Sequence, residues 1–209
     1  SNQKNLGTIK SSNLCTEVIE YSSKEEVAVC NLASLSLPAF VGEDRCFDYA
    51  DFHATVKLAT KNLNRVIDRN MYPVEEAQRS NERHRPIGLG VQGLADCLIK
   101  MHVAYDSEEG IAIDRKIFEV MYHAAMEASW ELAVDKGAYE TFPGSPTSEG
   151  IFQFDLWGET EKVYAEGFYG KDEWEQLKAK VRKDGIRNSL LVAPMPTATT
   201  SQIMGNFTE

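Results

Sequence analysis

The sequence predicts an α/β fold, because two runs typical of buried strands are separated by amphipathic helices. Val27 to Leu37 is rich in small, β-branched and aliphatic residues and is closed by Pro38, and Ser189 to Ala193 is a second apolar run. Buried strands separated by helices favour a parallel or mixed sheet, open or closed. With 209 residues, of which 43% are hydrophobic, the chain can bury a sizeable core in one or two domains.

Four helices are predicted, two of them from the spacing of apolar side chains. From Tyr49 to Asn70 apolar residues recur at helical intervals, and Pro73 ends the pattern. A shorter helix is predicted over Leu94 to Met101 and a longer one over Ala112 to Lys136, and a strongly charged helix over Asp172 to Lys183. Glycines directly after Lys136 and close after Lys183 are typical helix ends.

The remaining segments are predicted to be less regular. Ser1 to Ser12 and Thr141 to Gly170 are interpreted as loops, and Glu75 to Arg85 as a polar connection. Pro86 to Gly93 is interpreted as two glycine-rich turns, and Ser201 to Met204 as the start of a helix. Val18 to Tyr21 is predicted to be extended.

Charge and hydropathy exclude several classes of function. The chain carries 22 Lys and Arg against 32 Asp and Glu, a net charge of -10, which argues against a general electrostatic affinity for nucleic acid or anionic membrane. A small phosphorylated ligand is still compatible with this charge, because local geometry decides such sites. No run of about 18 apolar residues and no signal-peptide core is present, so a cytoplasmic protein is expected.

The cysteines and histidines form no metal pattern in the sequence. Cys15, Cys30, Cys46 and Cys97 include no CxxC pair and no histidine at zinc-finger spacing, so they are interpreted as buried thiols, one or two of them chemically active. The other candidate ligands, His53, His102 and His123, have no paired spacing, and His84 between two arginines is expected on a solvated or salt-bridged surface. No metal site is predicted.

The first candidate for chemistry is the cluster Asn13, Cys15 and Glu17. In an extended or tightly turned backbone, alternate side chains project to one side, which would bring an amide, a thiol and a carboxylate together. Such a set can bind hydroxyls, transfer a hydrogen atom and accept a proton. The alternative is an ordinary turn that contains a cysteine.

The second candidate is the loop Pro196, Thr197, Ala198, Thr199 and Thr200, which follows a predicted strand and precedes a predicted helix. Its hydroxyls and backbone N–H groups could bind an anion, as at other strand-to-helix junctions. A helix cap rich in Ser and Thr is the alternative. Gly88 to Gly93 also matches the dinucleotide fingerprint GxGxxG, but no buried strand is predicted before it, so that interpretation is rejected.

Four separated motifs resemble class I ribonucleotide reductase large subunits, and the eukaryotic type fits best. Asn13-Leu14-Cys15-Thr16-Glu17 and the stretch Val27 to Ser34 resemble that family's active-site finger and adjoining strand. Arg83 to Asp96 resembles another family signature, and Arg187 to Thr200 resembles the substrate-phosphate loop. The motifs follow the family's order over nearly the whole chain, although the stretch from about Glu159 to Tyr169 departs from the family's pattern.

The resemblance implies a mechanism for reducing ribonucleoside diphosphates to deoxyribonucleoside diphosphates. Cys15 would be the transient thiyl radical that takes hydrogen from C3′, Glu17 would remove the 3′-hydroxyl proton, and Asn13 would hold the sugar hydroxyls. Cys30 would be one of two reducing thiols, with its partner upstream of this chain. Asn13 and Glu17, together with Pro196, Thr197, Ala198, Thr199 and Thr200, would bind the substrate, the loop holding its diphosphate.

The fold implied by the resemblance is a ten-stranded α/β barrel with Cys15 on a finger loop inside it. Residues 1–209 would be a fragment of this catalytic domain, without the N-terminal regulatory region and the C-terminal part, and inactive alone. No cofactor is expected within the chain. A metal-containing small subunit would supply the radical, thioredoxin or glutaredoxin the electrons, and ATP, dATP and other deoxynucleotide effectors would bind elsewhere on a large subunit that is a homodimer or higher oligomer.

Two rival functions remain open at this point. A glycyl-radical enzyme shares the barrel but would need a C-terminal glycyl loop. A catalytically silent nucleotide-binding or scaffold module would not need Asn13, Cys15, Glu17 and Cys30 together.

Overall fold

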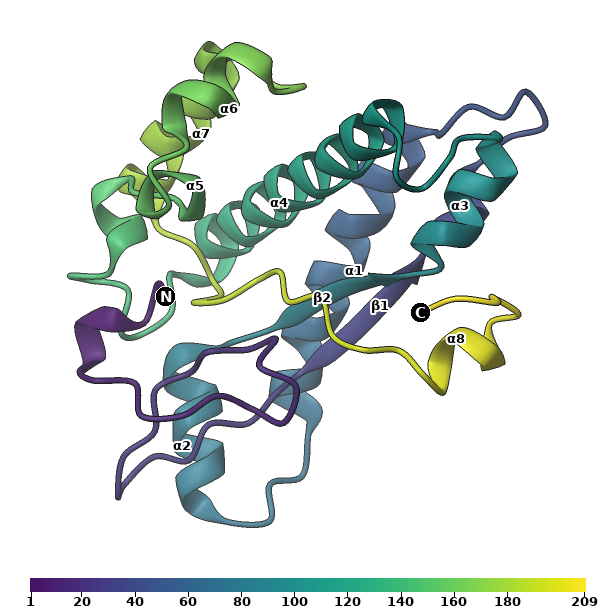
Figure 1. The fold of residues 1–209 in the computed structure, drawn as a ribbon. Helices are drawn as coiled ribbons and strands as arrows, with labels where there is room; N and C mark the ends of the chain where they lie inside the picture. Colours follow the sequence, from purple (N-terminus) through teal and green to yellow (C-terminus); the bar gives the residue numbers. More distant parts are fainter.

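The computed structural model describes residues 1–209, and a small parallel sheet lies at its centre (Figure 1). Strands β1 (Leu32–Ser36) and β2 (Gly88–Gln92) are parallel and align Leu32 with Gly88. Residues 189–193 run along the other side of β2. There the Leu89 amide donates to Leu191 O at 2.8 Å, and the Ala193 amide donates to Leu89 O at 2.9 Å. Both predicted strand regions are therefore extended and flank β2.

The two predicted strands are shorter than the sequence indicated. Regular pairing begins only at Leu32, and Leu37 already belongs to the 3-10 helix η2 (Leu37–Phe40). β1 is also half-buried rather than fully buried, with Leu32 exposed. Residues 189–193 form a single parallel bridge, between Leu89 and Val192, instead of a continuous ladder.

The prediction of two turns in the glycine-rich stretch is wrong, because residues 88–92 form strand β2. A Cβ on Gly88 would lie 2.5 Å from Leu32 Cδ2, and one on Gly90 would lie 2.9 Å from the Ala193 carbonyl oxygen. Glycine is required here by the close approach of both neighbouring segments. Only Gly93, with a φ of 72°, has the left-handed conformation, and helix α3 (Leu94–Met101) follows it. The rejected dinucleotide turn is indeed not formed, since Gly88 and Gly90 lie inside the strand.

The long helices agree closely with the sequence. α1 (Tyr49–Arg69) is capped by Asp48, whose carboxylate accepts from the Ala50 and Asp51 amides. α4 (Glu108–Lys136) starts earlier than Ala112, because the Ser107 hydroxyl caps it by accepting from the Gly110 amide. α7 (Lys171–Asp184) and α3 match their predicted ranges to within a residue.

Several helices lie in segments that the sequence analysis interpreted as irregular. The polar connection contains α2 (Glu75–His84), whose first turn carries Glu75 and Glu76 as the helix dipole favours. The other additional elements are short: η1 (Lys4–Leu6), η3 (Pro146–Glu149), α5 (Gln153–Leu156) and α6 (Thr160–Glu166). The helix start predicted at Ser201 to Met204 is confirmed by α8 (Thr200–Ile203).

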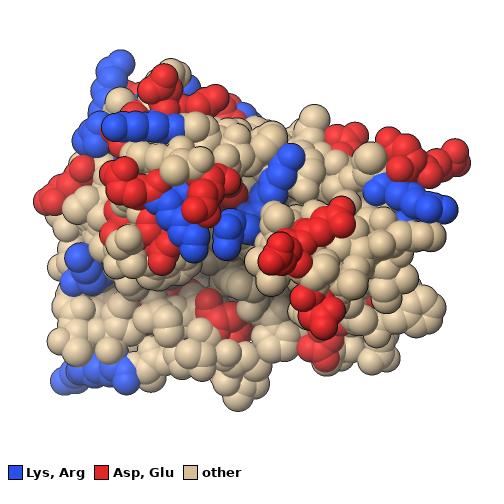
Figure 2. Space-filling view, turned by 45° about the horizontal axis from the view of Figure 1, so that its top comes forward, with Lys and Arg blue, Asp and Glu red and all other residues tan.

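The core lies between α1, α4 and the strand pair, and α7 packs on the other side of α4 (Figure 1). α4 buries side chains broadly around its circumference because it is covered from both sides. Val120, Met121 and Ala124 are completely buried. No helix is both long and apolar enough to cross a bilayer. The face in Figure 2 carries acidic and basic side chains intermingled rather than a basic patch.

Candidate active site

The N-terminal segment is held against residues 189–193 by two buried amide side chains. Asn2 Nδ2 donates to the Ser189 carbonyl at 2.9 Å, and Gln3 Nε2 donates to Ser189 Oγ at 3.0 Å. Gln3 Oε1 in turn accepts from the Tyr21 amide at 2.7 Å. These contacts fix both ends of the segment that carries the first candidate cluster, because Asn2 and Tyr21 lie on either side of it.

The candidate cluster forms a tight turn. Asn13 Oδ1 accepts from the Val18 amide at 3.0 Å, and the Thr16 amide donates to Asn13 O at 3.3 Å. Thr16 has a φ of 67°, in the left-handed region, so the backbone is not the extended strand that would alternate side chains regularly. Cys15 is exposed at the tip of this turn, while Asn13 and Glu17 are partly buried.

Glu17 lines a cleft with a volume of about 780 Å³. One wall is formed by Leu190 to Pro194 and another by α4 residues that include Phe118 and Tyr122. Glu17 Oε2 is buried and has no hydrogen-bond partner. A carboxylate oxygen so placed can accept a proton or hydrogen bond from a molecule in the cleft.

Cys30 lies in the extended segment just before β1 and is influenced by two carboxyl groups. Burial, followed by the charges of Glu20 and Glu17, raises the pKa of Cys30 to about 11. Glu17 and Glu20 therefore lie within electrostatic range of the thiol, which stays protonated at neutral pH.

Glu20 is a residue of this region that the sequence analysis missed. It is 7% exposed, its Oε2 has no partner, and burial raises its pKa to about 8. The sequence contained no signal for this, because a single glutamate in a short extended stretch is usually exposed.

The prediction of buried cysteines is wrong for three of the four. Cys15, Cys30 and Cys46 are exposed, and only Cys97, on α3, is buried. The exposed thiols lie in a turn or in irregular segments rather than in a helix or strand. Burial statistics for cysteine therefore fail at these three positions, although neighbouring side chains such as Val18 and Phe47 are buried.

The second candidate loop follows residues 189–193 and leads into α8. Thr197 is 4% exposed, and its Oγ1 has no hydrogen-bond partner, whereas Ala198, Thr199 and Thr200 face solvent. The preceding Met195 crosses β2 above Gly90, and Ser34 Oγ donates to its sulfur at 2.8 Å. A Cβ on Gly90 would lie 3.1 Å from Met195 Sδ, so a side chain there would displace Met195 from this position.

The structure brings some of the candidate residues together and leaves others apart. Glu17 and Cys30 share one electrostatic environment, but Asn13, Cys15 and Cys30 do not line the cleft, and neither do residues 196–200. Cys30 precedes the start of β1, whereas the 196–200 loop follows the end of the parallel segment 189–193. The thiol and the loop thus lie towards opposite ends of strands about 16 Å long.

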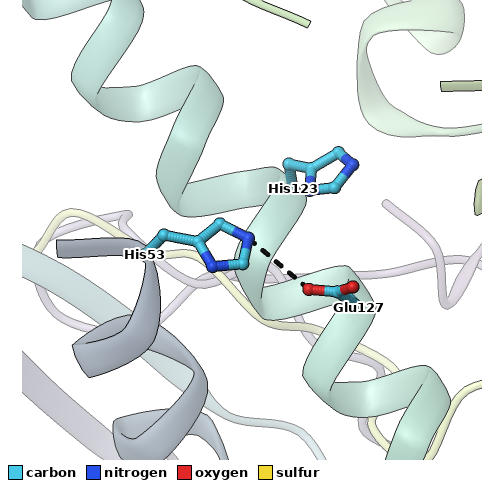
Figure 3. A group of neighbouring side chains, drawn as sticks. All are labelled: His53, His123 and Glu127. Carbon is cyan, nitrogen blue, oxygen red and sulfur yellow. Dashed lines mark ion pairs between the residues drawn. The ribbon is translucent and has the colours of Figure 1, made fainter. Parts of the chain in front are cut away.

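A separate cluster joins two histidines that the sequence left unpaired. His53 from α1 lies against the face of α4 that carries His123 and Glu127 (Figure 3), and His53 Nε2 is 3.5 Å from Glu127 Oε2. Burial lowers the pKa of His53 and lowers that of His123 to about 4. The inference that no metal constellation can be built from the histidines is corrected here, because the packing of α1 on α4 is not visible in residue spacing.

Comparison with known proteins assigns this set of residues to a family. The family model described as the ribonucleotide reductase barrel domain matches residues 1–209. The chain belongs to the ribonucleotide reductase barrel domain family. Similar curated proteins include the ribonucleoside-diphosphate reductase large subunits of Trypanosoma brucei brucei, with 57% identity, and of Caenorhabditis elegans, with 55% identity. Each alignment covers 99% of this chain and 25% of the relative.

Membership in the ribonucleotide reductase family confirms the resemblance seen in the four motifs. The chain spans about a quarter of the length of the curated relatives it matches, including the large chain of Cryptosporidium parvum at 54% identity. The mixed helix and strand composition agrees with the predicted α/β class.

Proposed function

We propose that residues 1–209 form part of the catalytic domain of a ribonucleoside-diphosphate reductase large subunit. The observation that carries the proposal is the 57% identity to such a subunit along 99% of the chain, with Asn13, Cys15, Glu17 and Cys30 all present. In the intact protein these residues belong to a ten-stranded α/β barrel with Cys15 on an interior finger loop. The remaining strands come from other parts of the large subunit.

The reaction divides into hydrogen transfer and reduction. The Cys15 thiyl radical takes the hydrogen atom from C3′ of a ribonucleoside diphosphate, and Glu17 accepts the 3′-hydroxyl proton. The 2′-hydroxyl leaves as water, with a proton from the reducing thiols. Cys30 and an upstream cysteine supply two electrons and become a disulfide, and Cys15 returns its hydrogen to C3′. In the net reaction, a ribonucleoside diphosphate and a dithiol give a deoxyribonucleoside diphosphate, water and a disulfide.

Two structural observations support the assigned roles. Glu17 has a buried carboxylate oxygen without a partner at the edge of a cleft, as expected for a group that accepts a substrate proton. The raised pKa of Cys30 keeps it a thiol at neutral pH, and a thiol is the form that carries the hydrogen needed for reduction.

Substrate binding is assigned to Asn13, Glu17 and the loop of residues 196–200. Asn13 holds the ribose hydroxyls, which favours productive transfer over loss of the radical. The exposed Thr199 and Thr200 hydroxyls and the backbone N–H groups bind the diphosphate, whereas Thr197, whose side chain is buried, supports the loop. Cys30 and the 196–200 loop lie towards opposite ends of the strands, so substrate binding requires the loop and the thiol to move closer together.

The partners of the intact enzyme follow from the same assignment. A metal-containing small subunit supplies the radical, which reaches Cys15 from outside the chain, and thioredoxin or glutaredoxin reduces the disulfide again. The large subunit works as a homodimer or higher oligomer in the cytoplasm, and nucleotide effectors bind outside residues 1–209.

The decisive experiment replaces single cysteines in the intact large subunit assayed with its small subunit. Cys15→Ser should abolish deoxynucleotide formation and leave diphosphate binding within about twofold, because the thiol acts in chemistry rather than in affinity. Cys46→Ser is the matched control, since Cys46 is also an exposed free thiol. Activity retained in Cys15→Ser, or lost equally in Cys46→Ser, would contradict the assignment.

A further inference from the structure

Three side chains from two helices converge at the α1–α4 contact, outside the candidate active site. His53 lies on α1, and His123 and Glu127 lie one turn apart on α4. One potential ligand atom from each lies within 4.8 Å of the other two (Figure 3). His53 and Glu127 are each about 25% exposed, so an ion can enter from solvent.

His123 is already oriented and has an unused nitrogen. Its ring stacks on Tyr169, with ring centroids 3.9 Å apart, which fixes the plane of the imidazole. Its Nδ1 is buried and makes no hydrogen bond. A buried nitrogen without a partner is uncommon and calls for a ligand, a water or an ion.

The position also accommodates a positive charge. Lys57 Nζ lies 2.9 Å from Glu127 Oε2, on the same oxygen that faces His53. Lys57 also contacts Glu131 Oε1 at 2.6 Å, so it keeps an ionic partner when Glu127 turns to another cation. Two further cations lie near the cluster. Lys61 Nζ pairs with Glu131 Oε2 at 2.9 Å, and the charge of Lys180, on α7, acts on His123.

We propose that His53, His123 and Glu127 bind a divalent metal ion of the zinc class, with water in the fourth position. Two imidazole nitrogens and one carboxylate oxygen are a zinc donor set, whereas magnesium and calcium prefer oxygen alone. Tetrahedral ligands about 2.1 Å from zinc lie roughly 3.4 Å from one another. His53 Nε2 and Glu127 Oε2 are already 3.5 Å apart, so small side-chain rotations complete the site. The ion joins α1 to α4.

The test is a titration of the intact protein with ZnCl₂ by calorimetry, after its exposed thiols have been alkylated. One ion per chain is expected. His53→Gln and Glu127→Gln should each weaken binding at least about tenfold, which corresponds to ~1.4 kcal/mol. His102→Asn is the matched control, because His102 is an exposed histidine at the end of α3, and asparagine tolerates its left-handed backbone.

Two further measurements separate metal binding from folding. Zinc should raise the midpoint of thermal unfolding of the wild type and of His102→Asn, but not that of Glu127→Gln, with circular dichroism confirming that each metal-free variant is folded. Lys57→Gln should bind zinc more tightly than the wild type, because a competitor for Glu127 is removed. Absence of binding, or equal affinity in the wild type, His53→Gln and Glu127→Gln, would overturn the proposal.

Discussion

Ser129 Oγ donates to Asn188 Oδ1 at 3.0 Å in the interior, and the Asn188 amide donates back to Ser129 Oγ at 2.9 Å. Asn188 Nδ2 also reaches Asn64 on α1 and the carbonyl of Arg85. This pair of side chains therefore positions the start of the 189–193 segment against α1 and α4.

Ser129→Ala should destabilise the protein by about 1–3 kcal/mol, because the Asn188 amide and side chain lose a buried partner. The free energy of unfolding in urea measures this effect. Ser11→Ala, in the exposed N-terminal loop, is the control and should change that free energy by less than about 0.5 kcal/mol. Equal stabilities of the two variants would show that the pair does not support the fold.

Glu20 should make stability fall as the pH rises. The folded state holds the Glu20 proton up to a pKa of about 8, because the carboxyl is buried, whereas the unfolded state releases it near 4.5. Between these values the folded state binds more protons than the unfolded state, so its stability decreases with increasing pH. Glu20→Gln should remove this contribution, and urea midpoints measured across that pH range test it.

Glu43→Gln, at an exposed turn before α1, is the control for Glu20 and should keep the wild-type pH dependence. If the midpoints of Glu20→Gln changed with pH as steeply as those of the wild type, the carboxyl of Glu20 would not be the group responsible.

Gly90→Ala should destabilise the protein by about 1–3 kcal/mol, because the new Cβ would lie 2.9 Å from the Ala193 carbonyl oxygen. It would also approach Met195 Sδ at 3.1 Å. Adding Met195→Ala should relieve only the second contact, so the double variant should stay less stable than Met195→Ala alone. Thermal unfolding of the three variants measures this, and full recovery in the double variant would exclude a backbone clash.

Lys178→Met should lower the free energy of unfolding by about 3 kcal/mol, which is the lower end of the range for breaking a buried ion pair. The Lys178 ammonium is buried on α7, 2.8 Å from Asp155 Oδ2 and 2.8 Å from the Tyr164 hydroxyl. Asp155 retains hydrogen bonds from the Phe152 amide and the Thr160 hydroxyl, which limits the loss. Lys183→Met, exposed on the same helix, should leave the urea midpoint nearly unchanged.

The long helices and the family could both be predicted from the amino-acid sequence. α1 and α4 follow from apolar periodicity, with Pro73 and Gly137 marking their ends, and α3 and α7 occupy the segments predicted for them. The motif around Cys15 and the Arg187 to Thr200 stretch carried the family resemblance, since those residue orders are local and specific.

Features that depend on contacts between distant segments could not be predicted from the sequence and became visible in the folded chain. β2 is a strand because β1 and residues 189–193 pair with it on either side, and their close approach favours glycine at positions 88 and 90. His84 is buried rather than solvated, because Glu26 and Thr141 each supply a hydrogen bond to its ring. His53 meets His123 because α1 packs on α4, and Cys15 is exposed because no other segment of this chain covers its turn. Local periodicity holds no information on such pairings, because each is made by side chains that are far apart in sequence.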